Sequence, residues 1–170
     1  MKRFKVYDLV LVSLFSAILF VQEQIFSSLP NIQLTFFLII LFSKKLPIIH
    51  SILIILIHVI LDSLFTSSFT IIYTPFILIG YLIIPLTLKT IFKNIESNIG
   101  LAFLSILYAF IYSWLFIIPF VGILKVDFIS YLAADLIFEI LLAASSFLTT
   151  IVLYNPLSKI FDDKLRYLKH

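Results

Sequence analysis

The chain contains no cysteine, which excludes disulfide bonds and thiolate metal sites. Charge is also scarce, because only 12% of its 170 residues are Asp, Glu, Lys or Arg. These charges form short clusters separated by apolar runs, which are as long as the ~20 residues that a helix needs to cross a ~30 Å hydrocarbon layer. We therefore expect no soluble domain, and any chemistry must be done by helices and their short connections.

Sequence motifs for ATP hydrolysis and for enzymatic catalysis are missing as well. The sequence has no G-x-x-x-x-G-K-[ST] phosphate loop, so we do not expect the chain itself to hydrolyse ATP. It has neither an H-E-x-x-H metal motif nor a G-x-S-x-G nucleophile motif, which argues against an intramembrane enzyme. We expect no catalytic residue, no cofactor and no resident metal ion.

Hydrophobic residues make up 62% of the chain, with 19 Phe and a mean hydropathy of +1.20. This composition is typical of an all-α membrane protein, here a single domain over residues 1–170. The basic, apolar start looks like a signal peptide, but no small-x-small cleavage site follows, so we interpret it as the first helix. We predict a cytoplasmic tail at 155–170 and six crossings, at 8–26, 32–43, 47–65, 71–90, 99–120 and 128–154.

The cations predict the orientation of these crossings. With a cytoplasmic N-terminus, eleven of the twelve Lys and Arg residues fall inside and only Lys125 falls outside. Because inner loops carry an excess of Lys and Arg, both termini are predicted to be cytoplasmic. The high pI has the same explanation, since nucleic-acid binding would need a continuous basic face.

Five carboxylates gather toward the predicted outer end: Glu23, Asp62, Asp127, Asp135 and Glu139. A charge at mid-membrane costs at least ~2.5–3.5 kcal/mol, so acids inside helices normally face a cavity or a partner. Something polar is therefore expected to be enclosed there. Five outer acids against one outer Lys favour a neutral or cationic ligand over an anionic one.

Two pairs with four-residue spacing allow alternatives. Asp135 and Glu139 share a helix face that continues to Ser146, and such a like-charged pair repels. One of the two is then protonated or paired with a ligand or side chain, unless both stay hydrated near the surface. His58 and Asp62 are either two ligands of a metal site or a hydrogen-bonded pair, and in a helix bundle the pair is favoured.

Other residues affect how the helices bend, pack and form walls for a ligand. Pro75, Gly80 and Pro85 allow the helix at 71–90 to bend and free backbone groups, which a membrane tolerates only against protein or a water-lined cavity. Ser13 and Ala17 form a small-xxx-small pair, which lets another helix approach closely. Flat walls for a ring-containing ligand are available, although some of these side chains are interfacial aromatics: Tyr73, Tyr81, Tyr112, Trp114 and Tyr131.

Three segments resemble, in order, the helix 1–2, helix 3–4 and helix 6 regions of the substrate-binding S components of energy-coupling factor (ECF) transporters. They are "VQEQIFSSLPNIQLTFFLIILFSKKL", "HVILDSLF" followed by "YTPFILIGYL", and "YLAADLIFEILLAASSFLTTIVLYNPL". The most specific parts are LPN-I-Q-L after a Gln-Glu pair, L-D at the end of helix 3, and D-L-x-F-[DE] in helix 6. The first pattern most resembles S components associated with cobalamin.

This resemblance implies a six-helix bacterial membrane protein that captures a vitamin or related micronutrient at its outer end. Two ATPases and a membrane coupling protein would power uptake, and Ser13 and Ala17 would pack on the coupling protein. By position Gln22, Glu23, Asn31 and Gln33 belong to the loop 1 gate or its hinge. The remaining pocket residues by position are Asp62, Asp135 and Glu139, together with Tyr81 and Ser146, which stand where Trp and Asn are common.

Two alternatives stay open. The first alternative is a self-sufficient proton-coupled carrier with Asp135, Glu139 or Asp62 as proton sites. The small size of the chain and the absence of an internal repeat argue against it. The polar stretch from Glu23 to Phe37 either lines and covers the pocket, with Pro30 ending the first helix, or is a plain hydrated turn capped by Asn31.

Overall fold

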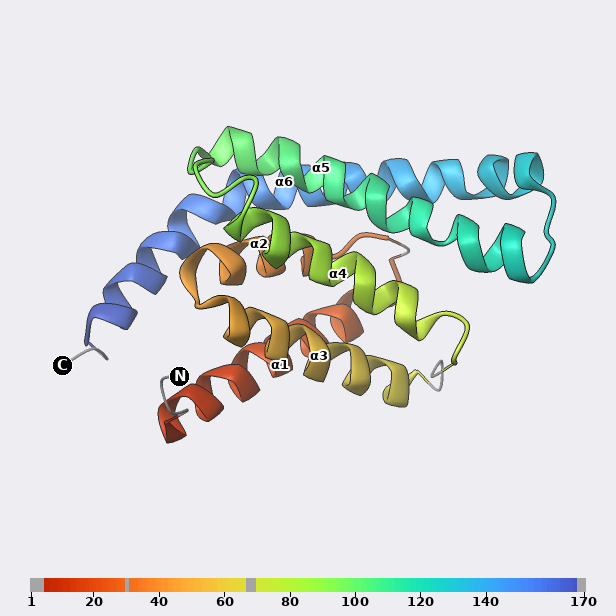
Figure 1. The fold of residues 1–170 in the computed structure, drawn as a ribbon. Coiled ribbons are helices and arrows are strands. Elements are labelled where there is room, and N and C mark those ends of the chain that lie inside the picture. The colour runs from red at the N-terminus through yellow and green to blue at the C-terminus, as the bar shows by residue number, and fades with distance from the viewer. Residues whose placement is uncertain (1–4, 30, 67–69, 168–170) are drawn as a thin grey trace.

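The computed structural model describes residues 5–29, 31–66 and 70–167, without side-chain detail at 164–167. Four residues used in the predictions lie outside the described residues: Pro30 of the polar stretch, and Lys2, Arg3 and Lys169 among the eleven inner cations. The chain is all-helical over the described ranges, with no strand (Figure 1). Its helices are α1 (Val6–Phe26), α2 (Thr35–Lys45), α3 (Ile48–Phe65), α4 (Thr74–Lys89), α5 (Asn98–Leu115), the π-helical turn η1 (Ile118–Ile123) and α6 (Phe128–Tyr167).

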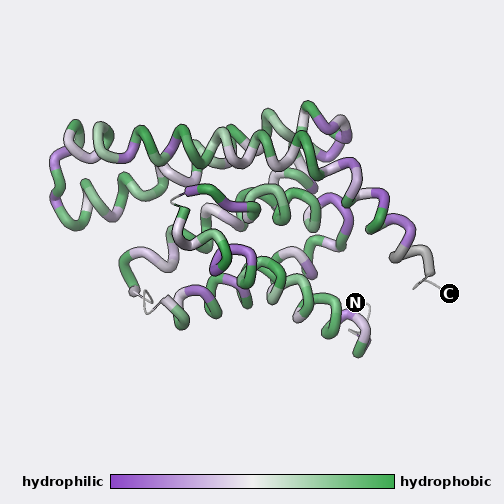
Figure 2. The backbone as a smooth tube through the Cα atoms, turned by 180° about the vertical axis from the view of Figure 1, so that it is seen from behind, coloured by the Kyte–Doolittle hydropathy of each residue, from purple (hydrophilic) through white to green (hydrophobic). Residues whose placement is uncertain are grey.

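Four stretches are long and apolar enough to cross a membrane: α1, α3, Asn98–Ile123 and Phe128–Asp163. Hydrophobic residues run along most of the helices (Figure 2). Many of their side chains point outward, including Val10 and Leu14 on α1 and Leu148 and Val152 on α6. An apolar outer surface of this kind is expected where lipid, not water, surrounds the helices.

The second helix lies at the centre of the bundle. All residues from Thr35 to Ser43 are buried, and α2 contacts each of the other five α-helices. Eleven residues make a helix about 16 Å long, roughly half of a hydrocarbon layer. The predicted crossing at 32–43 is therefore a short enclosed helix, and the space at its N-terminal end is open for a cavity.

Helix α6 continues beyond the predicted boundary at residue 154, so the predicted tail is largely helical. Pro156 lies inside the helix and removes one backbone N–H. Contacts beyond the proline offset that loss: Phe161 stacks on Phe15 with ring centroids 5.0 Å apart, and Asp162 Oδ2 lies 2.7 Å from Lys45 Nζ. Tertiary packing thus overrides the helix-breaking signal.

Helices α5 and α6 lie side by side and extend together past the other helices (Figure 1). Small buried side chains line the α5 face, among them Ala102, Ser105 and Ala109, and α6 contributes Ala143 and Ser146. Small residues let two backbones approach closely, which explains the long contact between these helices. The hairpin from Phe116 to Tyr131 is carried at the far end of this pair.

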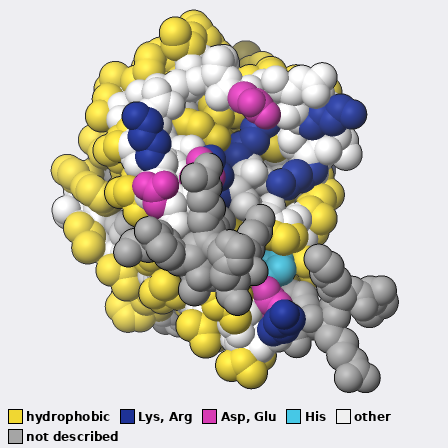
Figure 3. Space-filling model, turned by 90° about the vertical axis from the view of Figure 1, so that its left-hand side faces the viewer, with side chains coloured by type: hydrophobic (Ala, Val, Ile, Leu, Met, Phe, Trp, Pro, Cys, Tyr) yellow, Lys and Arg dark blue, Asp and Glu magenta, His cyan; other side chains and the backbone are white. Residues whose placement is uncertain are grey.

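The start of α1 and the end of α6 lie at the same end of the bundle. Asp8 Oδ1 lies 3.0 Å from His50 Nε2 at the start of α3, and Lys44 Nζ donates to the carbonyls of Phe92 and Lys93 at 3.1 and 3.2 Å. Figure 3 looks onto this end, where Lys side chains lie around a few acids. We call it the lysine-rich end.

Candidate functional site

A cavity of about 460 Å³ opens at the end of the bundle opposite the lysine-rich end. This volume lies within the ~300–1,000 Å³ range of small-molecule sites. Its walls come from the C-terminal ends of α1 and α3, the loop before α2, and parts of α4, α5, η1 and α6. Six of the predicted site residues line it: Glu23, Asn31, Gln33, Asp62, Tyr81 and Asp135.

The end of α1 holds the start of α2 in place beneath this cavity. Gln22 is 6% exposed; its Nε2 donates to the Leu19 carbonyl at 3.0 Å and to Thr35 Oγ1 at 2.6 Å. Its Oε1 accepts the Leu34 N–H at 2.9 Å, and Thr35 Oγ1 donates to Glu23 Oε1 at 2.5 Å. These side chains satisfy groups that a buried helix start would otherwise leave unpaired.

The carboxylates of Glu23 and Asp62 have different partners. His58 Nε2 lies 3.3 Å from Glu23 Oε2, and the Tyr81 hydroxyl is 3.4 Å from Glu23 Oε1. Asp62 Oδ1 instead accepts the Gln24 amide at 3.1 Å. The prediction of a hydrogen bond between His58 and Asp62 is therefore wrong. Helix α1 packs on α3, and this packing brings the Glu23 carboxylate to the His58 imidazole. No metal-binding group of three or more His, Cys, Asp or Glu occurs in the described part of the chain.

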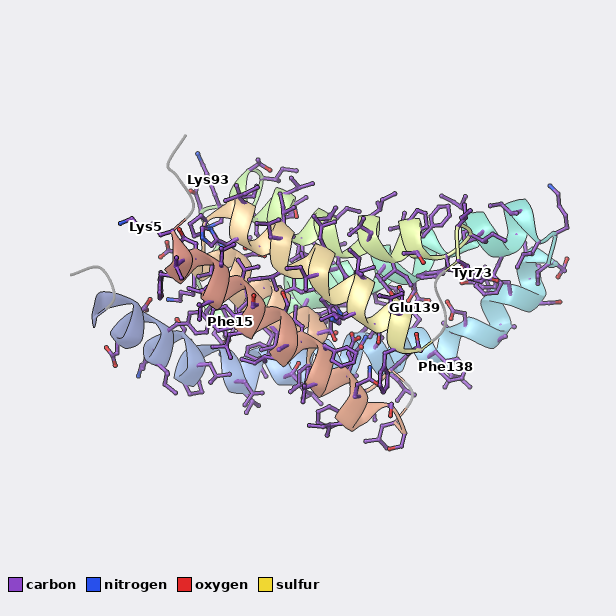
Figure 4. All side chains as sticks on the ribbon, turned by 90° about the horizontal axis from the view of Figure 1, so that it is seen from below. Lys5, Phe15, Tyr73, Lys93, Phe138 and Glu139 are labelled. Carbon is purple, nitrogen blue, oxygen red and sulfur yellow. The ribbon has the colours of Figure 1, made fainter. Side chains whose placement is uncertain are left out.

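Aromatic rings form two stacked pairs in the cavity wall. Tyr81 and Tyr112 stack with centroids 5.0 Å apart, and Phe36 contacts both rings in T-shaped geometry. Phe120 and Tyr131 stack at 5.1 Å across the connection between α5 and α6. Tyr73 does not line the cavity but lies against Phe120, 5.4 Å between centroids, near the end opposite Lys5 and Lys93 in Figure 4.

The loop before α2 is fixed to α6 on the far side of the cavity. Asn31 adopts φ +58°, a left-handed conformation that Asn tolerates, and its Nδ2 donates to the Phe138 carbonyl at 2.9 Å. The Gln33 N–H donates to Ser145 Oγ at 3.2 Å, and that hydroxyl lies 3.1 Å from the Gln33 carbonyl. Asn31 therefore ties the loop to α6 and does not cap α2, contrary to the plain-turn alternative.

The side chains of Asp135 and Glu139 have different surroundings, although the two residues are one helical turn apart. Asp135 lines the cavity, where its Oδ2 is 3.4 Å from the Tyr131 hydroxyl. Glu139, which is labelled in Figure 4, does not line it. This residue is 5% exposed and interacts with Trp114, and its Oε1 has no hydrogen-bond partner among the described residues. Of these two acids, both predicted to lie in or beside the pocket, Asp135 lines the cavity and Glu139 does not.

Trp114 and Ser146 also lie away from the cavity lining. Trp114 is 57% exposed on the outside of α5, which is a position for an interfacial aromatic. Ser146 is fully buried about one turn beyond Leu142, the last α6 residue of the lining. Sequence reasoning missed Phe26, Phe116 and Phe120, which do line the cavity, because 19 Phe residues make any single one uninformative.

Asp127, one of the five acids predicted at the outer end, has a structural role. Its Oδ2 accepts the N–H and the hydroxyl of Ser130, both at 2.9 Å, so it caps the start of α6. The backbone N–H of Ser130, and then its hydroxyl, hold the pKa of Asp127 below the usual value for aspartate. It is exposed and does not belong to the cavity lining.

No family model, no curated protein and no solved structure matches this chain.

Proposed function

We propose that the chain is a substrate-binding S component of an ECF-type ABC importer in the bacterial cell membrane. It would capture a vitamin or related micronutrient from outside for ATP-driven uptake. The observation that carries this proposal is the cavity, because it gathers carboxylates, amides and stacked aromatic rings at the end opposite the lysine-rich end. Under the positive-inside rule the lysine-rich end is cytoplasmic, which makes the cavity outward-facing and both termini cytoplasmic.

The exposed face of α1 supports a partner in the membrane. Ser13 and Ala17 are both exposed, whereas the neighbouring Val12 and Ser16 are buried against the rest of the bundle. The small-xxx-small pair is therefore free to receive another helix at close range. In this proposal the partner is the coupling protein, and two ATPases attached to it supply the energy that this chain has no phosphate loop to provide.

We expect Ala17→Trp to reduce co-purification of these partners strongly. Native purification from gently solubilised membranes, followed by mass spectrometry, should find two ATPases and a coupling protein with the unaltered chain. The indole should lower their recovery by about tenfold or more, because it prevents close helix approach. Val152→Trp is the matched control, since Val152 is 63% exposed on α6, and should leave recovery unchanged. A chain that purifies without ATPases contradicts the proposal.

A self-sufficient proton-coupled carrier is the second candidate, and Glu139 is the observation that favours it. A buried carboxyl oxygen without a partner is costly unless it is protonated or hydrated. The buried hydroxyls of Ser146 and Thr150 also have no partner among the described residues, and all three groups lie on the side of α6 that faces the bundle. Uptake that is driven by a proton gradient in vesicles containing this chain alone would favour this candidate.

A further inference from the structure

We infer that the cavity takes a compact organic cation that carries an aromatic ring or a quaternary nitrogen. This inference rests on the proposed function, because it names the ligand class of the same cavity. It starts from the charge of the lining: Glu23, Asp62 and Asp135 contribute carboxylates, and no Lys, Arg or His is among the described residues that line the cavity. Lys125 is exposed in the connection between η1 and α6 and does not line it.

Two of these carboxylates keep an oxygen for a ligand. Both oxygens of Glu23 are engaged, by Thr35 and Tyr81 on one side and His58 on the other. Asp62 and Asp135 each accept one side-chain hydrogen bond, from Gln24 and Tyr131, through a single oxygen. An anion placed here would meet uncompensated negative charge in a medium of low dielectric constant, whereas a cation would neutralise it.

The lining argues for an organic cation and against a metal ion. A metal ion needs several ligands converging on one point, and no cluster of three or more His, Cys, Asp or Glu converges in the described residues. The cavity has room for more than an ion, at about 460 Å³. It therefore fits a larger cation whose charge reaches Asp62 or Asp135 while its body fills the space between them.

The stacked rings add a second source of attraction for such a ligand. Tyr81 with Tyr112, and Phe120 with Tyr131, present aromatic surface to the same cavity that holds the free carboxylate oxygens. A cation over an aromatic face is attracted by the negative charge of the ring face, and more strongly when water is excluded. Carboxylates together with aromatic faces are the chemistry that recognises pyridinium and quaternary ammonium groups.

The test compares three probes of nearly the same shape on the purified full chain: 1-methylnicotinamide (a cation), nicotinamide (neutral) and nicotinate (an anion), with choline as a second cation. Affinities are measured by saturation-transfer NMR titration. We expect a cation to bind at least about tenfold more tightly than nicotinamide, and nicotinate not to bind. Asp62→Asn and Asp135→Asn should each weaken the cation by about tenfold, whereas Asp127→Asn, outside the lining, should not.

Other results overturn the inference. Equal or tighter binding of nicotinamide or nicotinate contradicts it, and so do failure of both cations to bind and an Asp135→Asn variant that binds them as well as the unaltered chain. Circular dichroism and size-exclusion profiles establish that the variants are folded. Mass spectrometry of the molecule retained in native preparations separates the two proposals. A retained neutral or anionic ligand contradicts the cation inference alone. Cation binding by a chain that purifies without ATPases contradicts only the proposal of an ECF-type importer.

Discussion

Replacing Gly80 with alanine is expected to destabilise the protein and deform the cavity wall. A Cβ at this position would lie 2.5 Å from Cδ2 and 3.2 Å from Cε2 of Tyr112. The Tyr112 ring has little room to retreat, because it stacks on Tyr81 and contacts Phe36 and Phe116 at centroid distances of 5.5 and 5.3 Å. Overpacking of this kind costs about 1–3 kcal/mol, which thermal unfolding in detergent should detect as a lower melting temperature.

Gly122→Ala is the matched control for this substitution. Apart from the adjoining backbone of its own segment, no atom lies within 4 Å of the Cβ position at Gly122, so the same added methyl group should leave the melting temperature nearly unchanged. Because Tyr112 lines the cavity, Gly80→Ala should also weaken binding of any ligand retained by the unaltered chain. A Gly80→Ala protein that melts at the same temperature as Gly122→Ala would mean that the Tyr112 wall is not tightly packed.

Gln22→Leu is expected to be the most damaging change in the polar stretch at the end of α1. Leucine has a similar size but leaves the Leu34 N–H without its partner at the buried start of α2, and it also removes the bond to Thr35. An unsatisfied buried donor costs about 1–3 kcal/mol. Gln24→Leu makes the same chemical change where the side chain is only partly buried and bonds Asp62, and should cost less. Equal melting temperatures for the two variants would contradict the capping role.

Most of the helices could be predicted because polar or proline-containing clusters interrupt the apolar runs. The observed bounds of α1 and α3 differ from the predicted ones by two residues or fewer at each end. What the pattern could not reveal is that α2 is enclosed by protein. A helix surrounded by other helices and one surrounded by lipid are both apolar on all sides, so the run from Thr35 to Ser43 is compatible with either.

The candidate site was predicted in its location but only partly in its residues. Acids near the ends of three helices pointed to a polar space, and Glu23, Asp62 and Asp135 do line the cavity. Four residues of helix rotate a side chain by about 40° beyond one full turn. That rotation separates Glu139 from Asp135, and only the packing of α6 on its neighbours decides which of the two faces the cavity.

The contribution of the connection between α5 and α6 could not be seen from helical periodicity. The predicted crossing at 99–120 is interrupted after Leu115, and the π-helical turn η1 follows. A π-helical turn shifts the register of the side chains, so a period of 3.6 residues no longer identifies the inward face. Phe116 and Phe120 reach the cavity through this irregular segment.

Labelling of single introduced cysteines tests most directly whether the cavity faces outward. The native chain has no cysteine, so Ser27→Cys at the cavity rim and Asn94→Cys at the lysine-rich end can each be labelled without background. Both residues are exposed. With a membrane-impermeant maleimide applied to intact cells, we expect Ser27→Cys to react at once and Asn94→Cys only after permeabilisation. The reverse pattern would place the cavity on the cytoplasmic side and contradict capture of a substrate from outside.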